Sequence, residues 1–309
     1  MATHVVTSLK LNLRAAPDPS RNNVILVLPQ GTGLTKVANA PVPGWIEVTA
    51  QIVLSTVGGF VALSGLGPVG TAFPASPPVP AAGRLPRADL GAKPSARRDA
   101  KGSWANRIGE AGLPGLPSTH PQGTSAGIHA IIAWMSVGAP GHLRWKPSGA
   151  TTYCNVYAHD VALAAGCYLP RVWWTASAIS AILSGQTVPV TYGGTVNEMR
   201  ANNIFDWLEE FGSDFGWVRV FDVDALQTSV NTGRIGIVCA QRTQMNRPGH
   251  IQIIAPEVGP HAAKRAGGKV VQPLQSQAGS RNFDYGFLGN SWWMSANFRE
   301  FGFWTNAPG

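Results

Sequence analysis

Hydrophobic and polar positions alternate with the period of β-strands along the first third of the chain. Leu9, Leu11 and Leu13 alternate with polar residues, residues 24–28 form a continuous apolar run, and clusters of Pro, Asp, Asn and Gly separate such segments. Short strands joined by tight turns have this pattern. The sequence therefore predicts a small all-β domain over residues 1–66.

The pattern changes after residue 66, where Pro, Ala and Gly dominate and hydrophobic periodicity is lost. Residues 67–107 contain seven basic and two acidic residues, and so hold most of the net charge of +8 that the chain carries. A segment of this composition favours an extended, semi-rigid linker over a packed core. We predict a basic linker over residues 67–119, drawn to an anionic cell envelope. A nucleic-acid-binding face is not expected, because the third region is almost neutral.

Helical spacing of apolar residues returns in the third region. It predicts helices over residues 124–137, 152–165, 175–183 and 195–211, the last from a capping-box spacing of Thr195 and Glu198. Strands are predicted over residues 217–220, 236–240, 250–255 and 270–277. Helices followed by an antiparallel sheet indicate an α+β domain over residues 120–309.

Composition excludes several classes of protein. With 13% charged and 44% hydrophobic residues, the chain is neither a coiled coil nor wholly disordered. Its three cysteines are too widely spaced for a disulfide framework or a zinc site. The first residues lack the pattern of a secretory signal, and the uncharged residues 48–83 are broken by Gly and Pro, so no stable membrane span is expected.

Cys154 lies at the first turn of the predicted helix over residues 152–165. The unpaired amides and the positive end of the helix dipole lower the pKa of a thiol there, and the same N–H groups can stabilise an oxyanion. The alternative is that Cys154 is a small buried hydrophobic residue. Cys167 and Cys239 are expected in the core, and Asp160 is expected to bond locally at the helix surface.

A nucleophilic thiol needs a base, and the chain offers seven histidines. His159 is five residues from Cys154 and faces about 140° away from it around a helix. His250 is different, because it follows the turn Asn246-Arg-Pro-Gly249 and opens a strand. The other histidines lie in the first module, in or beside loops, or on the first helix: His4, His120, His129, His142 and His261.

Two segments resemble known families. The order of Leu11-Asn-Leu-Arg-Ala-Ala-Pro17, Leu28-Pro-Gln-Gly-Thr32, Gly44-Trp-Ile-Glu-Val48 and Gly58-Gly-Phe-Val-Ala62 resembles the bacterial SH3-type (SH3b) domain. Thr152-Tyr-Cys-Asn-Val-Tyr157, then Asn246-Arg-Pro-Gly-His-Ile-Gln-Ile-Ile254, then Gln275-Ser-Gln-Ala-Gly279 resemble the NlpC-type branch of papain-like cysteine peptidases and amidases. The expected fold is an SH3-like barrel, a Pro-rich linker and a papain-like α+β domain with its nucleophile at a helix N-terminus packed on an antiparallel sheet.

The second resemblance implies a catalytic triad and no cofactor or metal. Cys154 would attack an amide carbonyl, His250 would take the thiol proton, and a polar residue on the next strand would orient the ring. Gln277 fits this third position, with Gln275 and Asn282 as rivals. Tyr153 and Asn155 flank the nucleophile as supporting residues. Trp173, Trp174 and Tyr192 are candidates for lining a substrate groove, against the alternative that most tryptophans are core residues.

The predicted function is hydrolysis of an amide bond in the stem peptides of peptidoglycan. The bond is open among the D-Glu–diaminopimelate link, the D-Ala cross-link and the muramic acid–L-Ala amide. A chain made in the cytoplasm that acts on the wall or in the periplasm fits a phage endolysin, or an antibacterial effector with delivery machinery and an immunity protein. The alternatives are a non-catalytic wall-binding or structural protein, and a thiol deamidase or acyltransferase toxin.

Overall fold

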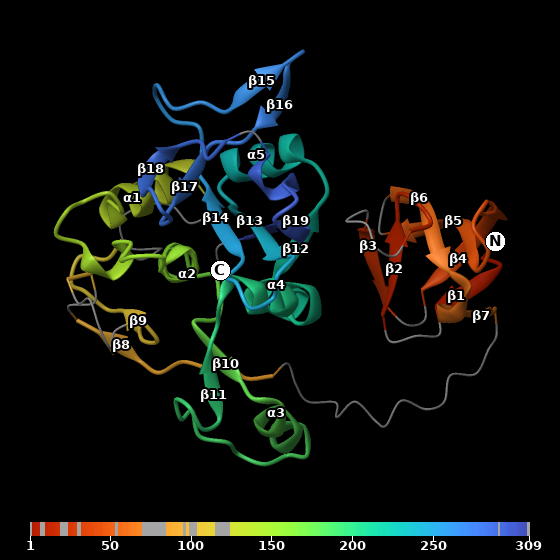
Figure 1. The fold of residues 1–309 in the computed structure, drawn as a ribbon, viewed down its shortest axis with the longest axis horizontal. Helices are drawn as coiled ribbons and strands as arrows, with labels where there is room; N and C mark the ends of the chain where they lie inside the picture. Colours follow the sequence, from red (N-terminus) through yellow and green to blue (C-terminus); the bar gives the residue numbers. More distant parts are fainter. Residues whose placement is uncertain are drawn as a thin grey trace. The chain divides into compact units, whose positions relative to one another are not determined.

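The computed structural model describes residues 2–6, 10–18, 24–29, 32–52, 55–69, 85–94, 97–98, 104–114, 124–289 and 291–307. The chain divides into two compact units, Met1–Ala82 (unit 1) and Gly83–Gly309 (unit 2) (Figure 1). Both contain antiparallel sheets, and the described helices longer than one turn lie in unit 2, so the fold is mixed α+β. No helix in the described ranges is long and apolar enough to cross a membrane.

Unit 1 is a seven-stranded antiparallel sheet in the order β3-β2-β6-β5-β4-β1-β7. The alternation seen in the sequence puts Leu13, Leu34 and Val48 on its buried face. Gly59 is needed where two strands meet, since a Cβ there would lie 2.7 Å from the carbonyl oxygen of Arg14. The strands are β1 His4–Val6, β2 Lys10–Arg14, β3 Val24–Pro29, β4 Gly33–Asn39, β5 Trp45–Ile52, β6 Ser55–Ala62 and β7 Leu66–Pro68.

Unit 2 is built on a six-stranded antiparallel sheet in the order β12-β19-β13-β14-β17-β18. These strands are β12 Trp217–Val220, β13 Ile235–Arg242, β14 His250–Ile254, β17 Gln275–Gln277, β18 Phe283–Gly286 and β19 Phe298–Asn306. The helices are α1 Ser125–Met135, α2 Cys154–Ala164, α3 Ala176–Leu183, α4 Ala201–Glu210 and α5 Val223–Asn231. Three two-stranded ribbons complete it: β8 Ala92–Lys93 with β9 Arg107–Ile108, β10 Val172–Trp174 with β11 Val196–Glu198, and β15 Lys264–Ala266 with β16 Lys269–Gln272.

The central sheet is buried on both faces. Ile237 and Cys239 of β13 belong to the core that includes α2 and α4, whereas Val238 and Ala240 belong to a second core with α5. Successive residues of a strand point to opposite faces, so each strand feeds both cores. Any side chain on β13 or β14 is thereby assigned to the α2 face or to the α5 face.

The predicted helix over residues 195–211 is wrong at its start. Residues Val196–Glu198 form β11, which pairs with β10, and α4 begins only at Ala201. The Thr195 hydroxyl donates to the carbonyl of Pro189 in a turn, and Glu198 bonds Arg171, so neither side chain caps a helix. The predicted strand over residues 270–277 is also split, because Pro273 lacks the N–H that a continuous ladder needs. Helix α5 and strand β19 are additions that the sequence pattern did not predict.

The predicted linker over residues 67–119 is wrong in part. Its described residues 85–94, 97–98 and 104–114, here called the strap, belong to unit 2. Leu85, Ala88 and Ile108 are buried in the core of that unit. Three apolar residues so far apart in the sequence make no periodic pattern, so the sequence did not predict that this segment packs. Each of them nevertheless fills a site on a core that other elements form.

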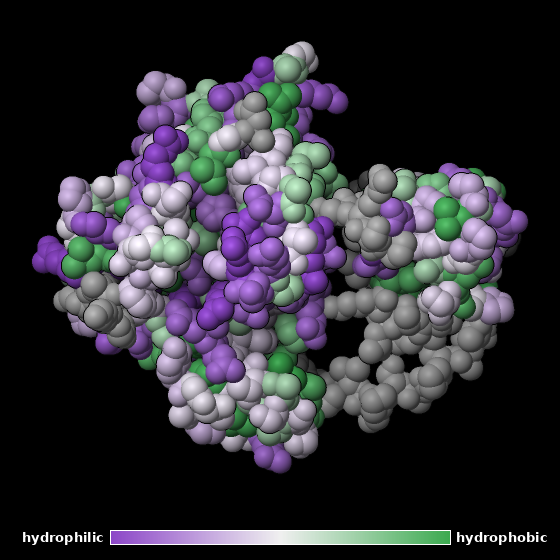
Figure 2. Space-filling model, in the orientation of Figure 1, coloured by the Kyte–Doolittle hydropathy of each residue, from purple (hydrophilic) through white to green (hydrophobic). Residues whose placement is uncertain are grey.

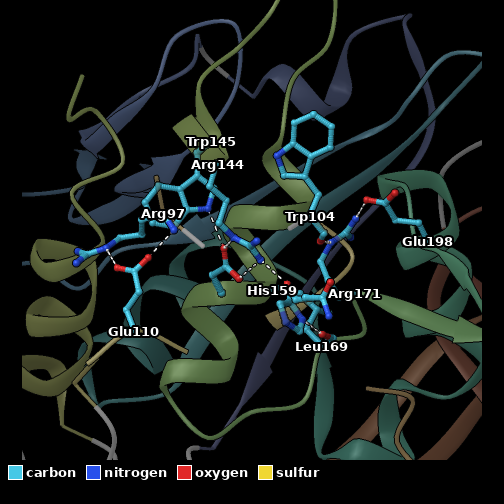
Figure 3. Close-up of polar contacts among 11 residues, drawn as sticks. Arg97, Trp104, Glu110, Arg144, Trp145, His159, Leu169, Arg171 and Glu198 are labelled. Carbon is cyan, nitrogen blue, oxygen red and sulfur yellow. Dashed lines mark hydrogen bonds and ion pairs between the residues drawn. The ribbon is translucent and has the colours of Figure 1, made fainter. Parts of the chain in front are cut away.

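Polar contacts hold the strap in place (Figure 3). Arg97 pairs with Glu110 inside the strap and donates to the carbonyl of Trp134 on α1, at 2.9 Å. The Trp174 indole donates to the carbonyl of Pro86 at 2.8 Å. The strap therefore forms part of unit 2 and is not part of a linker.

Candidate functional site

Cys154 is the first residue of α2, as the sequence predicts, and its side chain is only 4% exposed. Helix α2 packs on β14, and the backbone amides of Ile251 in that strand, of Asn155 and of Cys154 itself act to lower the pKa of the thiol. These amides therefore favour negative charge at the sulfur. Such an arrangement can stabilise negative charge on the sulfur or on an oxygen beside it.

The resting thiol is nevertheless neutral. Burial raises the pKa of Cys154 above its ordinary value, and the three amides and the charge of Arg171 only partly offset this effect. Cys239 lies on the same face, is fully buried, and is held by a contact from its sulfur to the carbonyl of Ala201 at 3.5 Å. Cys239 and Cys167 are core thiols, as predicted, and burial raises the pKa of both.

His250 and Gln277 lie together, at the start of β14 and the end of β17. The distance from His250 Nε2 to Gln277 Oε1 is 2.8 Å. Because an amide oxygen only accepts, Nε2 carries the proton and Nδ1 is the unprotonated nitrogen. The same oxygen accepts from the Gln252 amide, and Gln277 Nε2 donates to the carbonyl of Arg281 at 2.9 Å. The imidazole is therefore held in one tautomer by an amide that is itself fixed.

The imidazole is also neutral at rest. Burial lowers the pKa of His250 to about 4, the bond to Gln277 opposes this shift, and the charge of Arg242 adds to it. The ring packs edge-on against Trp292 at 4.7 Å between centroids, and the Trp292 indole donates to Gln252 Oε1 at 2.6 Å. Gln252 and Trp292 are thus partners of this histidine that the sequence analysis did not single out.

The pairing of Cys154 with His250 stays a prediction. No hydrogen bond joins the thiol to the imidazole in this part of the described chain. In the register of β13 and β14, Ile251 pairs with Cys239 on the α2 face, whereas His250 pairs with Ala240, which lies on the α5 face. The register therefore places the His250 side chain on the face of β14 opposite to the Ile251 side chain.

A pattern in the sequence could have predicted the face of β14 to which His250 points. In His250-Ile-Gln-Ile253, the polar residues alternate with isoleucines, so the two kinds occupy opposite faces of the strand. Helix α2 is buried almost all round and needs an apolar surface to pack on. The isoleucines meet that need, which turns His250 and Gln252 toward the α5 face.

The rivals of Gln277 are engaged elsewhere. Gln275 is fully buried, and its Oε1 accepts from the backbone N–H of Leu288 at 2.9 Å. Asn282 donates to the carbonyls of Val137 and Trp145, at 3.1 and 2.9 Å. Both side chains therefore tie loops together, whereas Gln277 alone among the three contacts His250.

Asp160 is not at the helix surface, as the sequence analysis expected, but fully buried. It accepts from Arg144 Nε and Nη2 at 2.7 and 2.9 Å and from the Trp145 indole at 2.8 Å (Figure 3). With all three donors fixed, this carboxylate is a structural anchor between α2 and the segment before it. His159, as expected, faces away from Cys154, and its Nδ1 bonds the carbonyl of Leu169.

A cavity of about 460 Å³ opens beside the residue that precedes Cys154. Tyr153 stacks on Trp104 of the strap at 4.7 Å between ring centroids, and Trp104 lines the cavity. Of the predicted groove residues only Tyr192 is here, with a side chain that is 56% exposed. The lining residues are Leu90, Trp104, Ala105, Asn106, Tyr192 and Glu198.

Arg171 connects this cavity to the start of α2. Its guanidinium pairs with Glu198 and donates to the carbonyls of Trp104 and Met199, at 2.6 and 3.0 Å. Asn155 donates to the same Met199 carbonyl at 2.7 Å, which is the supporting contact of that residue. A buried arginine inside a mixed segment gives no sequence signal of such a role.

Trp173 and Trp174 do not line a groove. Trp173 packs within an aromatic cluster with Tyr168, Trp207 and Phe215, and Trp174 is 5% exposed. Both are core residues, the alternative that the sequence analysis kept open.

Comparison with protein-family models and with curated proteins finds no match. Among solved structures, the chain is similar to NlpC2 from Trichomonas vaginalis, with 10% sequence identity and a TM-score of 0.21 over 96% of this chain and 74% of that one. At so low a TM-score, the similarity carries no information on the fold or the activity of this chain.

Proposed function

We propose that unit 2 is a papain-like thiol hydrolase that cleaves an amide bond in the stem peptides of peptidoglycan, with Cys154 as the nucleophile. The observation that supports this most directly is the position of the Cys154 thiol at the start of a buried helix, where three backbone amides act to lower its pKa. Attack on a carbonyl would place an oxyanion next to such donors. The substrate class comes from the order of motifs in the sequence, which resembles that of NlpC-type peptidases and amidases.

The base is His250 in this proposal. The ring would keep its bond from Nε2 to Gln277, and the unprotonated Nδ1 would accept the thiol proton. His250 is the first residue of β14, and the backbone amide of the next residue, Ile251, acts on the Cys154 thiol, so a short approach of the two side chains is sufficient. Catalytic contacts are often long in enzymes without substrate and tighten when it binds.

Unit 1 is proposed to be an SH3-type domain that binds the wall. Its motif order and its small antiparallel sheet, in which β1 pairs with both β4 and β7, support this assignment. The proposed setting is the bacterial wall or periplasm, reached as an endolysin or as a delivered effector with an immunity protein.

A second candidate is a non-catalytic wall-binding protein with a decayed site. It is favoured by the lack of a hydrogen bond between Cys154 and His250 among the described residues and by the 4% exposure of the thiol.

Incubation of the full chain with purified sacculi, followed by mass spectrometry of released fragments, tests both functions. The hydrolase predicts fragments that disappear with Cys154→Ala and with His250→Ala, and their masses identify the bond. The non-catalytic protein predicts sedimentation with sacculi and no fragments. Fragments that persist in Cys154→Ala would reject thiol catalysis.

A further inference from the structure

The turn between β13 and β14 leads directly into His250 and is firmly held. Asn202 near the start of α4 accepts from the backbone N–H of Arg242 at 3.0 Å and donates to the carbonyl of Arg247 at 2.9 Å. Thr243 donates through its backbone N–H to the carbonyl of Asn297 at 3.0 Å. Gly249 fits only because it has no Cβ, since one would lie 2.5 Å from Asn202 Oδ1. The turn is therefore fixed from both sides.

This turn forms a polar pocket of about 150 Å³. It is lined by two guanidinium groups, two side-chain amides, a hydroxyl and a methyl group, from Arg242, Arg247, Gln244, Asn297, Thr243 and Ala296. Hydrophilic residues gather on this face of unit 2, over α4 and the adjacent turn (Figure 2). No acidic side chain lines the pocket, so its charge is positive.

The two arginines are available to a ligand. Arg242 donates through Nε to the carbonyl of Pro248 at 3.2 Å, and its guanidinium lies 4.8 Å from the centre of the Phe298 ring. These contacts hold the group in place. Neither Arg242 nor Arg247 forms an ion pair with an acidic side chain among the described residues.

The pocket lies on the side of the sheet to which His250 points. Phe298, below Arg242, contacts Trp292 at 5.3 Å between ring centroids, and Trp292 contacts His250. The positive charge of Arg242 also acts on the imidazole. A group bound between the arginines would therefore be held next to the candidate base.

We propose that the Arg242–Arg247 pocket binds a carboxylate of the substrate, which selects stem peptides that carry a free acid. Planar guanidinium groups match a carboxylate in geometry and charge, and charge-assisted bonds are the stronger class of hydrogen bond. The identity of the peptide rests on the proposed function; the preference for a carboxylate rests on the pocket alone.

The test measures binding to the full-length Cys154→Ala protein by isothermal titration calorimetry. The probes are a synthetic L-Ala-γ-D-Glu stem peptide with a free α-carboxylate on D-Glu and the same peptide with that group amidated. The acid is expected to bind about tenfold more tightly than the amide, and added salt should narrow the gap. Arg247→Gln and Arg242→Gln should each remove the preference.

Lys269→Gln is the matched control, because it removes an exposed positive charge on the distant β16 and should leave the preference intact. Arg247 is exposed, so its substitution should not disturb folding, which circular dichroism checks. Equal affinity for the two peptides, a preference that survives both arginine substitutions, or no binding of either peptide would overturn the proposal. Arginine-dependent binding of inorganic phosphate without a preference for the acid would also overturn it.

The two proposals fail in different ways. Hydrolysis of sacculi by the wild type without a preference for the acid peptide refutes the pocket and leaves the hydrolase. A preference for the acid without hydrolysis leaves the pocket and refutes the hydrolase.

Discussion

Cys154 should react as an isolated buried thiol and not as half of a thiolate–imidazolium pair. Burial raises the pKa of the thiol and lowers that of His250 to about 4, and no hydrogen bond joins the two side chains among the contacts of the described residues. Both are therefore neutral at pH 7. An ion pair would instead hold the thiolate over several pH units below the ordinary thiol pKa.

The magnitude follows from the chemistry of alkylation. Iodoacetamide reacts with the thiolate, whose fraction rises about tenfold per pH unit below the thiol pKa, so the rate should rise about a hundredfold between pH 6 and pH 8. His250→Ala should change the rate by less than about twofold, because groups without contact couple by only a few tenths of a kcal/mol. The small exposure of the thiol, 4%, makes the reaction slow at every pH.

Intact-protein mass spectrometry of the full chain provides the rates. Cys154→Ala is the control for labelling at Cys167 and Cys239, which are 3% and 0% exposed. A rate that is flat from pH 6 to pH 8 and loses this plateau in His250→Ala would show an assembled pair at rest. That result would refute the prediction that the thiol and the imidazole are unpaired at rest.

Three further predictions concern the partners of these groups. Gln277→Ala should lower turnover on sacculi by about a hundredfold with little change in KM, because the imidazole loses the acceptor that orients it. An unchanged rate would show that Gln277 has only a structural role. Asp160→Asn should lower the free energy of unfolding in urea by about 3–5 kcal/mol, since it removes the carboxylate charge that faces the buried Arg144 guanidinium. Asp89→Asn, in a pair that is 42% and 44% exposed, should cost under about 1 kcal/mol, and similar losses in the two variants would contradict the burial argument. Burial lowers the pKa of His159 to about 4, so the unfolded state takes up its proton first as pH falls, and this group should contribute a loss of roughly 3 kcal/mol of stability between pH 6.5 and pH 4. His159→Asn should make that part of a urea-unfolding pH series shallower by this amount and leave the similar contribution of His250.

Local elements follow closely from the sequence where burial is periodic. The helix that begins at Cys154 and the strand that begins at His250 are both present, as their patterns predict. The contact of Gln277 with His250 is also present, because residues on paired strands and on one face must meet. The helix over residues 195–211 fails at its start, because Glu198 finds a buried arginine as a partner instead of a helix N-terminus.

Contacts between distant segments could not be predicted from the local pattern of hydrophobic residues. The strap has three buried core residues, Leu85, Ala88 and Ile108, which are scattered along it, and the core that they join is built by other elements of unit 2. The sequence predicts that Asp160 is a surface residue, because its partners Arg144 and Trp145 lie on the segment before α2 and contact it only in the folded structure.

The sequence by itself determined the all-β first unit, the helix start at Cys154 and the strand start at His250, because each depends on a local period of hydrophobic residues. Only the tertiary structure decided which face of the sheet each side chain reaches. That choice depends on which apolar surface helix α2 packs on. The isoleucines of β14 provide that surface, so the side chain of His250 points to the other face of the strand, where it meets Gln277.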